Sequence, residues 1–358
     1  MLSPRPCVHA IPEYHPPLAG RTGLRLDFNE NTDGCSPAVL KRLQRMGAEE
    51  LASYPERGLV EGNVAQFLGV DPSELLLTNG VDEAIHLLCQ TFLEPRDEAI
   101  IVVPTYSMYR IYMMAAGANV VSITAANDFA FPRAELISRL SPRTRMIAIA
   151  NPNNPTGSVV SQDQLLGVAR AAPNAAVLVD EAYFEFYGQS ILPSRGSAPP
   201  NLFVTRTFSK VYGLAGLRIG ALIGDPAQMQ NVRRVCSPYN VNAVALASLP
   251  EAIADQEYIR RYVAEVLESR SRLERALDTA GLPWWPSQGN FILARIGSAS
   301  FVDGMKRRGI LVRDRSQDPG CEGCVRITVG SRAVTDRLLI ALQQCLEEVG
   351  ALRGVAKL

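Results

Sequence analysis

The chain has 358 residues, of which 47% are hydrophobic and 20% charged, a composition typical of a globular protein with a sizeable core. Lysine plus arginine and aspartate plus glutamate both total 36, so the zero net charge argues against nucleic acid or an anionic membrane as a partner. The seven irregularly spaced cysteines and three histidines form neither a disulfide framework nor a zinc motif, so we expect a cytoplasmic protein without a metal.

The first 32 residues are predicted to form an extended arm. Prolines at positions 4, 6, 12, 16 and 17 interrupt any long helix there, while Leu24–Phe28 could form one short strand. The arm lacks the continuous apolar core of a secretory signal, and no run of about 18 apolar residues follows that could span a bilayer. Ser36 and Pro37 then predict a helix that continues to about Gly47.

From residue 60 onward, apolar runs alternate with helical patterns. Helices are predicted between most of the runs, for example over Val81–Phe92 and Gln162–Ala171. Strands that are apolar on both faces and joined by helical crossovers predict an α/β fold with a mostly parallel, doubly wound, seven-stranded sheet. The predicted strands are Leu75–Thr78, Ala99–Val103, Asn119–Thr124, Met146–Ala150, Ala176–Val179, Leu202–Thr205 and Ile219–Ile223.

The pattern changes after Asn242. Two long helical stretches, Ala243–Ala254 and Glu257–Ala280, are followed by short strands at Phe291–Arg295 and Val325–Val329 and by a final helix. We therefore expect a large ligand-binding domain over residues 33–242 and a smaller α/β domain over residues 243–358, with the arm of residues 1–32 as part of the smaller one.

Ligands of doubly wound sheets bind beyond the carboxyl ends of the strands, so the residues that follow each strand are the candidates. After the first strand, Gly80 and Val81 lead into a helix whose free N–H groups could bind a phosphate, although ordinary capping by Asn79 explains the same residues. After the second strand, Tyr106 could stack on a planar ring or simply pack in the core.

Two later strand ends carry polar residues that a plain turn does not need. Asn151–Gly157 follows the fourth strand, and Asn154 within it could donate to the phenolate oxygen of a bound ring. Asp180 ends the fifth strand, where burial of a carboxylate is costly unless a cation such as a protonated pyridine nitrogen is near; a helix N-cap is the alternative. Tyr183 could reach the same phenolate oxygen as Asn154.

The stretch Thr207–Arg218 lies between the last two predicted strands. Apolar surroundings favour the uncharged, nucleophilic amine of a lysine such as Lys210, which can then form a Schiff base. The hydroxyls of Thr207 and Ser209 and the guanidinium of Arg218 suit a phosphate. Alone, the stretch could equally be a loop with a surface ion pair. Together with the other strand ends, it predicts a phosphorylated aldehyde cofactor, of which pyridoxal phosphate is the common one.

These motifs resemble those of the fold-type I pyridoxal-phosphate aminotransferases. The motifs in question are Asn151–Gly157, Asp180–Tyr183, Thr207–Lys210 and Gly216–Arg218. Within that family the chain is most similar to the histidinol-phosphate aminotransferases, over about residues 10–350. That similarity rests on Tyr14–Pro17, Asn29–Asn31, Ser53–Pro55 and Val325–Gly330, while Thr32 and Val81 depart from the usual pattern.

The resemblance implies a role for each matching residue. Lys210 would be the catalytic residue, Asp180 would pair with the ring nitrogen, and Tyr54 would reach the cofactor of a partner subunit in a homodimer with composite active sites. The implied cofactor-binding residues are Tyr54, Gly80, Val81, Tyr106, Asn154, Asp180, Tyr183, Thr207, Ser209, Lys210 and Arg218, and the implied substrate-binding residues are Tyr14, Asn29, Arg313 and Arg326.

The implied reaction is transamination between an amino acid and a 2-oxo acid. Histidinol phosphate and 2-oxoglutarate would give imidazole-acetol phosphate and L-glutamate, a step of histidine biosynthesis. An aromatic amino acid aminotransferase and threonine-phosphate decarboxylase are the alternatives within the same fold. A pyridoxal-phosphate-binding regulator would need an added DNA-binding segment, which neither the resemblance nor the neutral charge supports.

Overall fold

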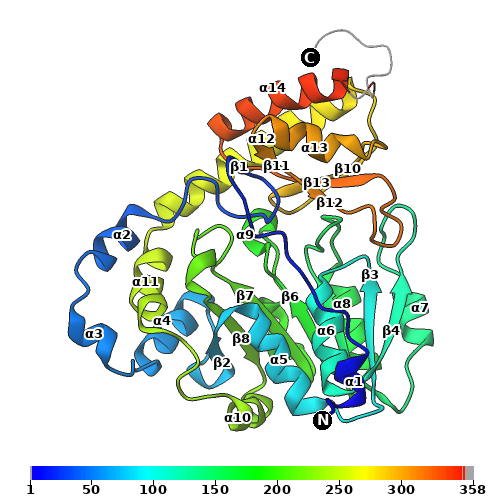
Figure 1. The fold of residues 1–358 in the computed structure, drawn as a ribbon. Helices are drawn as coiled ribbons and strands as arrows, with labels where there is room; N and C mark the ends of the chain where they lie inside the picture. Colours follow the sequence, from blue (N-terminus) through cyan, green and yellow to red (C-terminus); the bar gives the residue numbers. More distant parts are fainter. Residues whose placement is uncertain (1, 349, 351–358) are drawn as a thin grey trace.

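A computed structural model describes residues 2–348 and residue 350 of the chain. Its largest sheet has seven strands in the order β2-β8-β7-β6-β5-β3-β4 (Figure 1). Strand β8 is antiparallel to both of its neighbours, and all other pairs are parallel, which confirms the predicted α/β fold. The strands are β2 (Leu75–Thr78), β3 (Glu98–Val103), β4 (Asn119–Thr124), β5 (Thr144–Ala150), β6 (Ala176–Asp180), β7 (Leu202–Thr207) and β8 (Gly220–Gly224).

Helices cover both faces of this sheet. Alternate residues of a strand point to opposite faces, so Leu178 of β6 packs into one core layer while its neighbours Val177 and Val179 pack into the other. Helices α5 (Gly80–Phe92), α6 (Ser107–Ala116) and α10 (Pro226–Val235) contribute to the first layer, and α4 (Gly58–Leu68), α8 (Gln162–Ala171) and α11 (Ala243–Ala254) to the second.

A second sheet has the order β12-β13-β10-β9 and is antiparallel throughout. In Figure 1 it lies above the large sheet, beneath three helices. Its strands are β9 (Trp284–Trp285), β10 (Phe291–Arg295), β12 (Arg313–Asp314) and β13 (Cys324–Thr328), and the helices are α12 (Gln256–Thr279), α13 (Ser300–Arg307) and α14 (Arg332–Glu348). Sequence patterns predicted β10 and β13, whereas β9 and β12 are too short to give a periodic signal.

The N-terminal arm crosses from the large sheet to the smaller one (Figure 1). Helix α1 (Pro6–His9) lies against α6, where Arg5 donates to the carbonyl oxygen of Ala115 over 2.7 Å. Strand β1 (Leu24–Arg25) then pairs in parallel with β11 (Ile310–Leu311). The arm therefore joins the C-terminal third of the chain, and the exact domain boundaries stay a prediction.

One predicted helix was too long. Ser36 caps α2 (Pro37–Leu43) by accepting a hydrogen bond from the Ala38 N–H, as expected, but the helix ends before Gly47, which instead precedes α3 (Ala48–Ala52). The remaining short elements are α7 (Arg133–Ser138), α9 (Phe184–Tyr187), η1 (Pro72–Glu74), η2 (Leu192–Ser197) and η3 (Ala215–Leu217). Over the part of the chain that the structure describes, each helix is too short or too polar to cross a bilayer.

Candidate active site

A cavity of about 640 Å³ opens at the carboxyl ends of the central strands. It lies between the large sheet, the arm and the smaller sheet, as expected for a doubly wound fold. Twelve of the predicted site residues line it: Tyr14, Val81, Tyr106, Asn154, Asp180, Tyr183, Thr207, Ser209, Lys210, Arg218, Arg313 and Arg326. Gly80 and Asn29 are buried in contact with this wall, through Arg218 and Tyr183 respectively.

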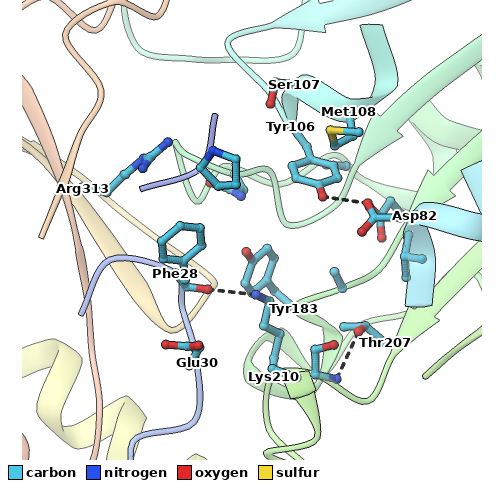
Figure 2. Close-up of a pocket in the computed structure, with 18 of the residues that line it drawn as sticks. Phe28, Glu30, Asp82, Tyr106, Ser107, Met108, Tyr183, Thr207, Lys210 and Arg313 are labelled. Carbon is cyan, nitrogen blue, oxygen red and sulfur yellow. Dashed lines mark hydrogen bonds between the residues drawn. The ribbon is translucent and has the colours of Figure 1, made fainter. Parts of the chain in front are cut away.

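Lys210 follows the end of β7 and points into the cavity. Its Nζ donates to the backbone carbonyl oxygen of Phe28 over 3.0 Å and lies 5.8 Å from the centre of the Tyr183 ring (Figure 2). Thr207 accepts a hydrogen bond from the Ser209 N–H over 3.1 Å, which holds the turn before the lysine. The amine therefore faces the cavity with a neutral partner from the arm.

Asp180 is the last residue of β6 and is 5% exposed. Tyr109 donates to its Oδ2 over 2.5 Å, and Thr205 donates to its Oδ1 over 3.0 Å. Burial raises the pKa of Asp180, while these two hydrogen bonds act in the opposite direction. The alternative that Asp180 caps a helix is wrong, because α9 begins only after Tyr183.

Asn154 and Tyr183 reach the cavity from neighbouring strand ends. The Tyr183 hydroxyl accepts a hydrogen bond from Asn29 Nδ2 over 2.9 Å, and Asn29 Oδ1 accepts one from Thr328. Asn154 Oδ1 accepts a hydrogen bond from Arg326. Asn154 and Tyr183, the two residues predicted to bind the phenolate oxygen of the cofactor, thus both line the cavity. Each is held by a predicted substrate-binding residue, Asn154 by Arg326 and Tyr183 by Asn29.

Gly80 and Arg218 form a cradle at the start of α5. Gly80 has φ +73°, a conformation that favours glycine, and a Cβ at this position would lie 2.4 Å from Nη2 of Arg218 and displace the guanidinium. Asp82 receives hydrogen bonds from Arg218 over 3.0 Å and from the Tyr106 hydroxyl over 2.8 Å (Figure 2). Asn79 makes no side-chain cap bond, so capping does not explain this turn.

Three arginines gather on the wall beside the smaller sheet. Arg326 is 5% exposed, and burial lowers its pKa to about 10. Arg313 contacts the Tyr14 hydroxyl over 3.4 Å, with its guanidinium 5.4 Å from the centre of the Phe28 ring. Arg315 also lines the cavity and forms an ion pair with Asp318. With three guanidinium groups and one carboxylate, that of Asp318, this side of the cavity carries a net positive charge.

Tyr54 lies outside the cavity of its own chain. Its side chain is 79% exposed, and its ring centre is 4.5 Å from that of Tyr239. The prediction that it serves the site of a partner subunit stays a prediction.

Among the lining residues that sequence reasoning missed are Phe28, Asp82, Tyr109 and Arg315, each of which contacts a predicted site residue or lies beside one. Tyr109 lies three residues after Tyr106 on a helical pattern, a spacing that places both on one face and could have identified it. Phe28 accepts the hydrogen bond of Lys210 through its backbone carbonyl oxygen, a group that every residue has, so its side-chain type could not have predicted this contact. Asp82 and Arg315 each neighbour a predicted anion site, but only tertiary contacts show which way they point.

Comparisons with known proteins point to one enzyme family. The family model for aminotransferase class I and II matches residues 21–342. A histidinol-phosphate aminotransferase from Paracoccus denitrificans (strain Pd 1222) is 36% identical, with 97% of each chain covered. The crystal structure of histidinol-phosphate aminotransferase from Sinorhizobium meliloti in complex with pyridoxal-5'-phosphate superposes with a TM-score of 0.87 at 25% identity, covering 96% of this chain and 97% of that one.

A second enzyme class shares the architecture. The crystal structure of L-threonine-O-3-phosphate decarboxylase from Porphyromonas gingivalis has a TM-score of 0.76 at 25% identity, covering 90% of this chain and 99% of that one. Fold alone therefore does not separate transamination from decarboxylation.

Proposed function

The chain belongs to the class I and II aminotransferases, and we propose that it transfers the amino group of histidinol phosphate to 2-oxoglutarate, a step of histidine biosynthesis. The enzyme is a pyridoxal-phosphate-dependent aminotransferase. The observation that carries the choice of substrate is the cluster of Arg313, Arg315 and Arg326 on the cavity wall, which suits the dianionic phosphate of that amino donor.

The residues present fit pyridoxal phosphate. The glycine-dependent cradle of Gly80 and Arg218 joins the N-terminus of α5, where free N–H groups and the helix dipole favour a phosphate. The buried carboxylate of Asp180 suits the ring nitrogen, and Lys210 suits the aldehyde end. When bound, the cofactor supplies an aldehyde that exchanges amino groups and a ring that withdraws electrons.

The protein's own residues would then position and deprotonate the substrate. Arg326 would hold the substrate phosphate, since its two acceptors, Asn154 Oδ1 and the Asp27 carbonyl oxygen, are both neutral and leave its charge uncompensated. The Lys210 amine would remove the proton from the carbon that carries the amino group of the donor, and in the second half-reaction it would deliver a proton to the corresponding carbon of the 2-oxo acid. Phe28 and Tyr14 from the arm would limit water access on the open side.

Assembly and location belong to the same proposal. Tyr54 is exposed beside Tyr239 on a surface that also presents Leu51 and Leu59, which suits a homodimer in which Tyr54 completes the partner's site. The seven cysteines are all free thiols, which fits a reducing cytoplasm.

The test compares amino donors. Purified protein saturated with pyridoxal phosphate would be given 2-oxoglutarate and histidinol phosphate, phenylalanine or threonine phosphate, and glutamate and carbon dioxide would be measured. We expect kcat/KM for histidinol phosphate to exceed that for phenylalanine by at least about tenfold, the contribution of a charged hydrogen bond.

Two outcomes would contradict the proposal. A preference for phenylalanine would indicate an aromatic aminotransferase, and carbon dioxide from threonine phosphate would indicate a decarboxylase. Lys210→Ala serves as the inactive control, because it removes the amine and leaves the arginine cluster in place.

A further inference from the structure

The carboxylate of Asp180 receives one hydroxyl on each of its oxygens. Tyr109 donates to Oδ2 over 2.5 Å from α6, and Thr205 donates to Oδ1 over 3.0 Å from β7. Both donors are fully buried, at 0% exposure. Because Thr205 is also the backbone partner of Asp180 between β6 and β7, one donor comes from within the sheet and the other from a helix packed on it.

Tyr109 also contacts the aromatic residue on the cavity wall. Its ring meets Tyr106 edge to face, with 5.6 Å between ring centres, and the Tyr106 hydroxyl is in turn held by Asp82. Tyr106 and Tyr109 therefore form a rigid pair, one facing the cavity and one reaching Asp180 beneath it. Burial and the charge of Asp180 raise the pKa of Tyr109 well above its usual value, so the hydroxyl stays a donor at every working pH.

We propose that Tyr109, together with Thr205, is a positioning residue that fixes the Asp180 carboxylate and keeps it ionised for the cofactor ring nitrogen. The need follows from burial. A carboxylate at 5% exposure favours its neutral form, and a neutral carboxyl attracts a protonated ring nitrogen far less than a carboxylate does.

The two hydrogen bonds also determine the direction in which the remaining lone pairs of the Asp180 carboxylate oxygens point. Two hydroxyl donors, one per oxygen, hold the carboxylate plane in a single orientation. With Tyr109 removed, Oδ2 would lose its short hydrogen bond and the carboxyl group could rotate or become protonated. The proposal rests on the cofactor site and not on the identity of the amino donor.

The test is a double-mutant cycle between Tyr109→Phe and Asp180→Asn. We expect Tyr109→Phe to raise the dissociation constant of pyridoxal phosphate, measured by titration of the cofactor-free protein, by about tenfold and to lower kcat by a similar factor. KM for the amino donor should change less than about threefold. In the Asp180→Asn background, Tyr109→Phe should have almost no further effect, because both changes act through one carboxylate.

Matched variants separate positioning from general packing. Tyr112→Phe makes the same change three residues later on α6, where the ring stacks on His86 at 5.3 Å, and should leave cofactor affinity within about twofold of wild type. Thr205→Ser should retain the affinity that Thr205→Val loses.

Three results would overturn the inference. The first is wild-type cofactor affinity and kcat in Tyr109→Phe. The second is full additivity with Asp180→Asn, which would show that Tyr109 acts independently of the carboxylate. The third is wild-type cofactor affinity in Asp180→Asn itself, which would remove the cofactor site on which the inference depends.

Discussion

Arg326 combines full burial with neutral hydrogen-bond acceptors. It extends from β13, and its guanidinium lies 5.6 Å from the centre of the Phe291 ring. Burial lowers its pKa to about 10, yet at neutral pH it stays charged. A buried cation held mainly by an amide and a carbonyl oxygen lacks full compensation, so an anionic substrate group would stabilise it strongly.

Replacing Arg326 should therefore affect substrate binding more than cofactor binding. We expect Arg326→Gln to lower kcat/KM for histidinol phosphate by about 100-fold, through the loss of a charged and bidentate contact. Arg326→Lys should recover little, since an ammonium group cannot match the fork of the guanidinium. Steady-state kinetics at saturating cofactor would measure both variants.

Arg313→Gln is the matched control, because Arg313 lies on the same wall but is only half-buried. We expect it to cost less than Arg326→Gln. A larger loss from Arg313→Gln would place the substrate's negative group at the outer arginine instead.

At the scale of elements, a buried charge network joins the segments that follow β6 and β7. Arg206 of β7 pairs with Glu181 over 2.9 Å and approaches Glu185 of α9 at 4.0 Å. Burial and the negative charge of Glu185 raise the pKa of Tyr212, which lies two residues after Lys210. The two chain segments that carry the site are thus tied together on the face of the sheet opposite Asp180 and Thr205.

This network gives the fold a pH dependence. Burial raises the pKa of Glu185 from 4.5 to about 7, so between these values the native state holds a proton that the unfolded chain releases. Stability from this group is therefore complete below about pH 4.5 and is lost as pH rises toward 7. Glu185→Gln should remove that loss and, relative to wild type, stabilise the protein at pH 8 by on the order of 3 kcal/mol.

Chemical denaturation at pH 5.5 and pH 8 would measure the difference between the variant and wild type. The variant should have the flatter pH dependence, with the larger gain at pH 8. An equal difference at both pH values would show that Glu185 does not titrate in this range. Glu257→Gln on the exposed side of α12 is the control for a charge change elsewhere.

The elements show what sequence can and cannot determine. The buried strands of the large sheet and helices such as α5 and α8 were predicted because each has enough residues to show a hydrophobic period. The pairing of β1 with β11 was beyond reach, because two-residue strands carry no period and their partners are 286 positions apart. Likewise the site residues that follow strands were found by motif, whereas Tyr109 and Asp82 are identified only by their contacts in the folded protein, with Asp180 and Arg218 respectively.

At the scale of the whole molecule, the arm and the smaller sheet enclose the cavity from the side away from the large sheet. Tyr14, Phe28 and Glu30 come from the arm, and Arg313 comes from β12 (Figure 2). The cavity wall thus draws on three separate parts of the chain. Tyr54 is the predicted site residue that these parts do not bring to the cavity, and a second copy of the chain is the proposed source of it.

Subunit mixing tests that source directly. We expect Tyr54→Ala to weaken cofactor binding and lower activity by at least about tenfold, because a hydrogen bond to a charged phosphate is lost. Lys210→Ala should be inactive with Tyr54 intact.

If sites are shared between subunits, a heterodimer of the two variants contains one doubly altered site and one site with both residues intact. Co-refolding at a 1:1 ratio makes half of the dimers mixed, so about one quarter of wild-type activity should return. If each site is built from a single chain, mixing restores nothing, and a fully active Tyr54→Ala variant would remove the role of Tyr54 altogether.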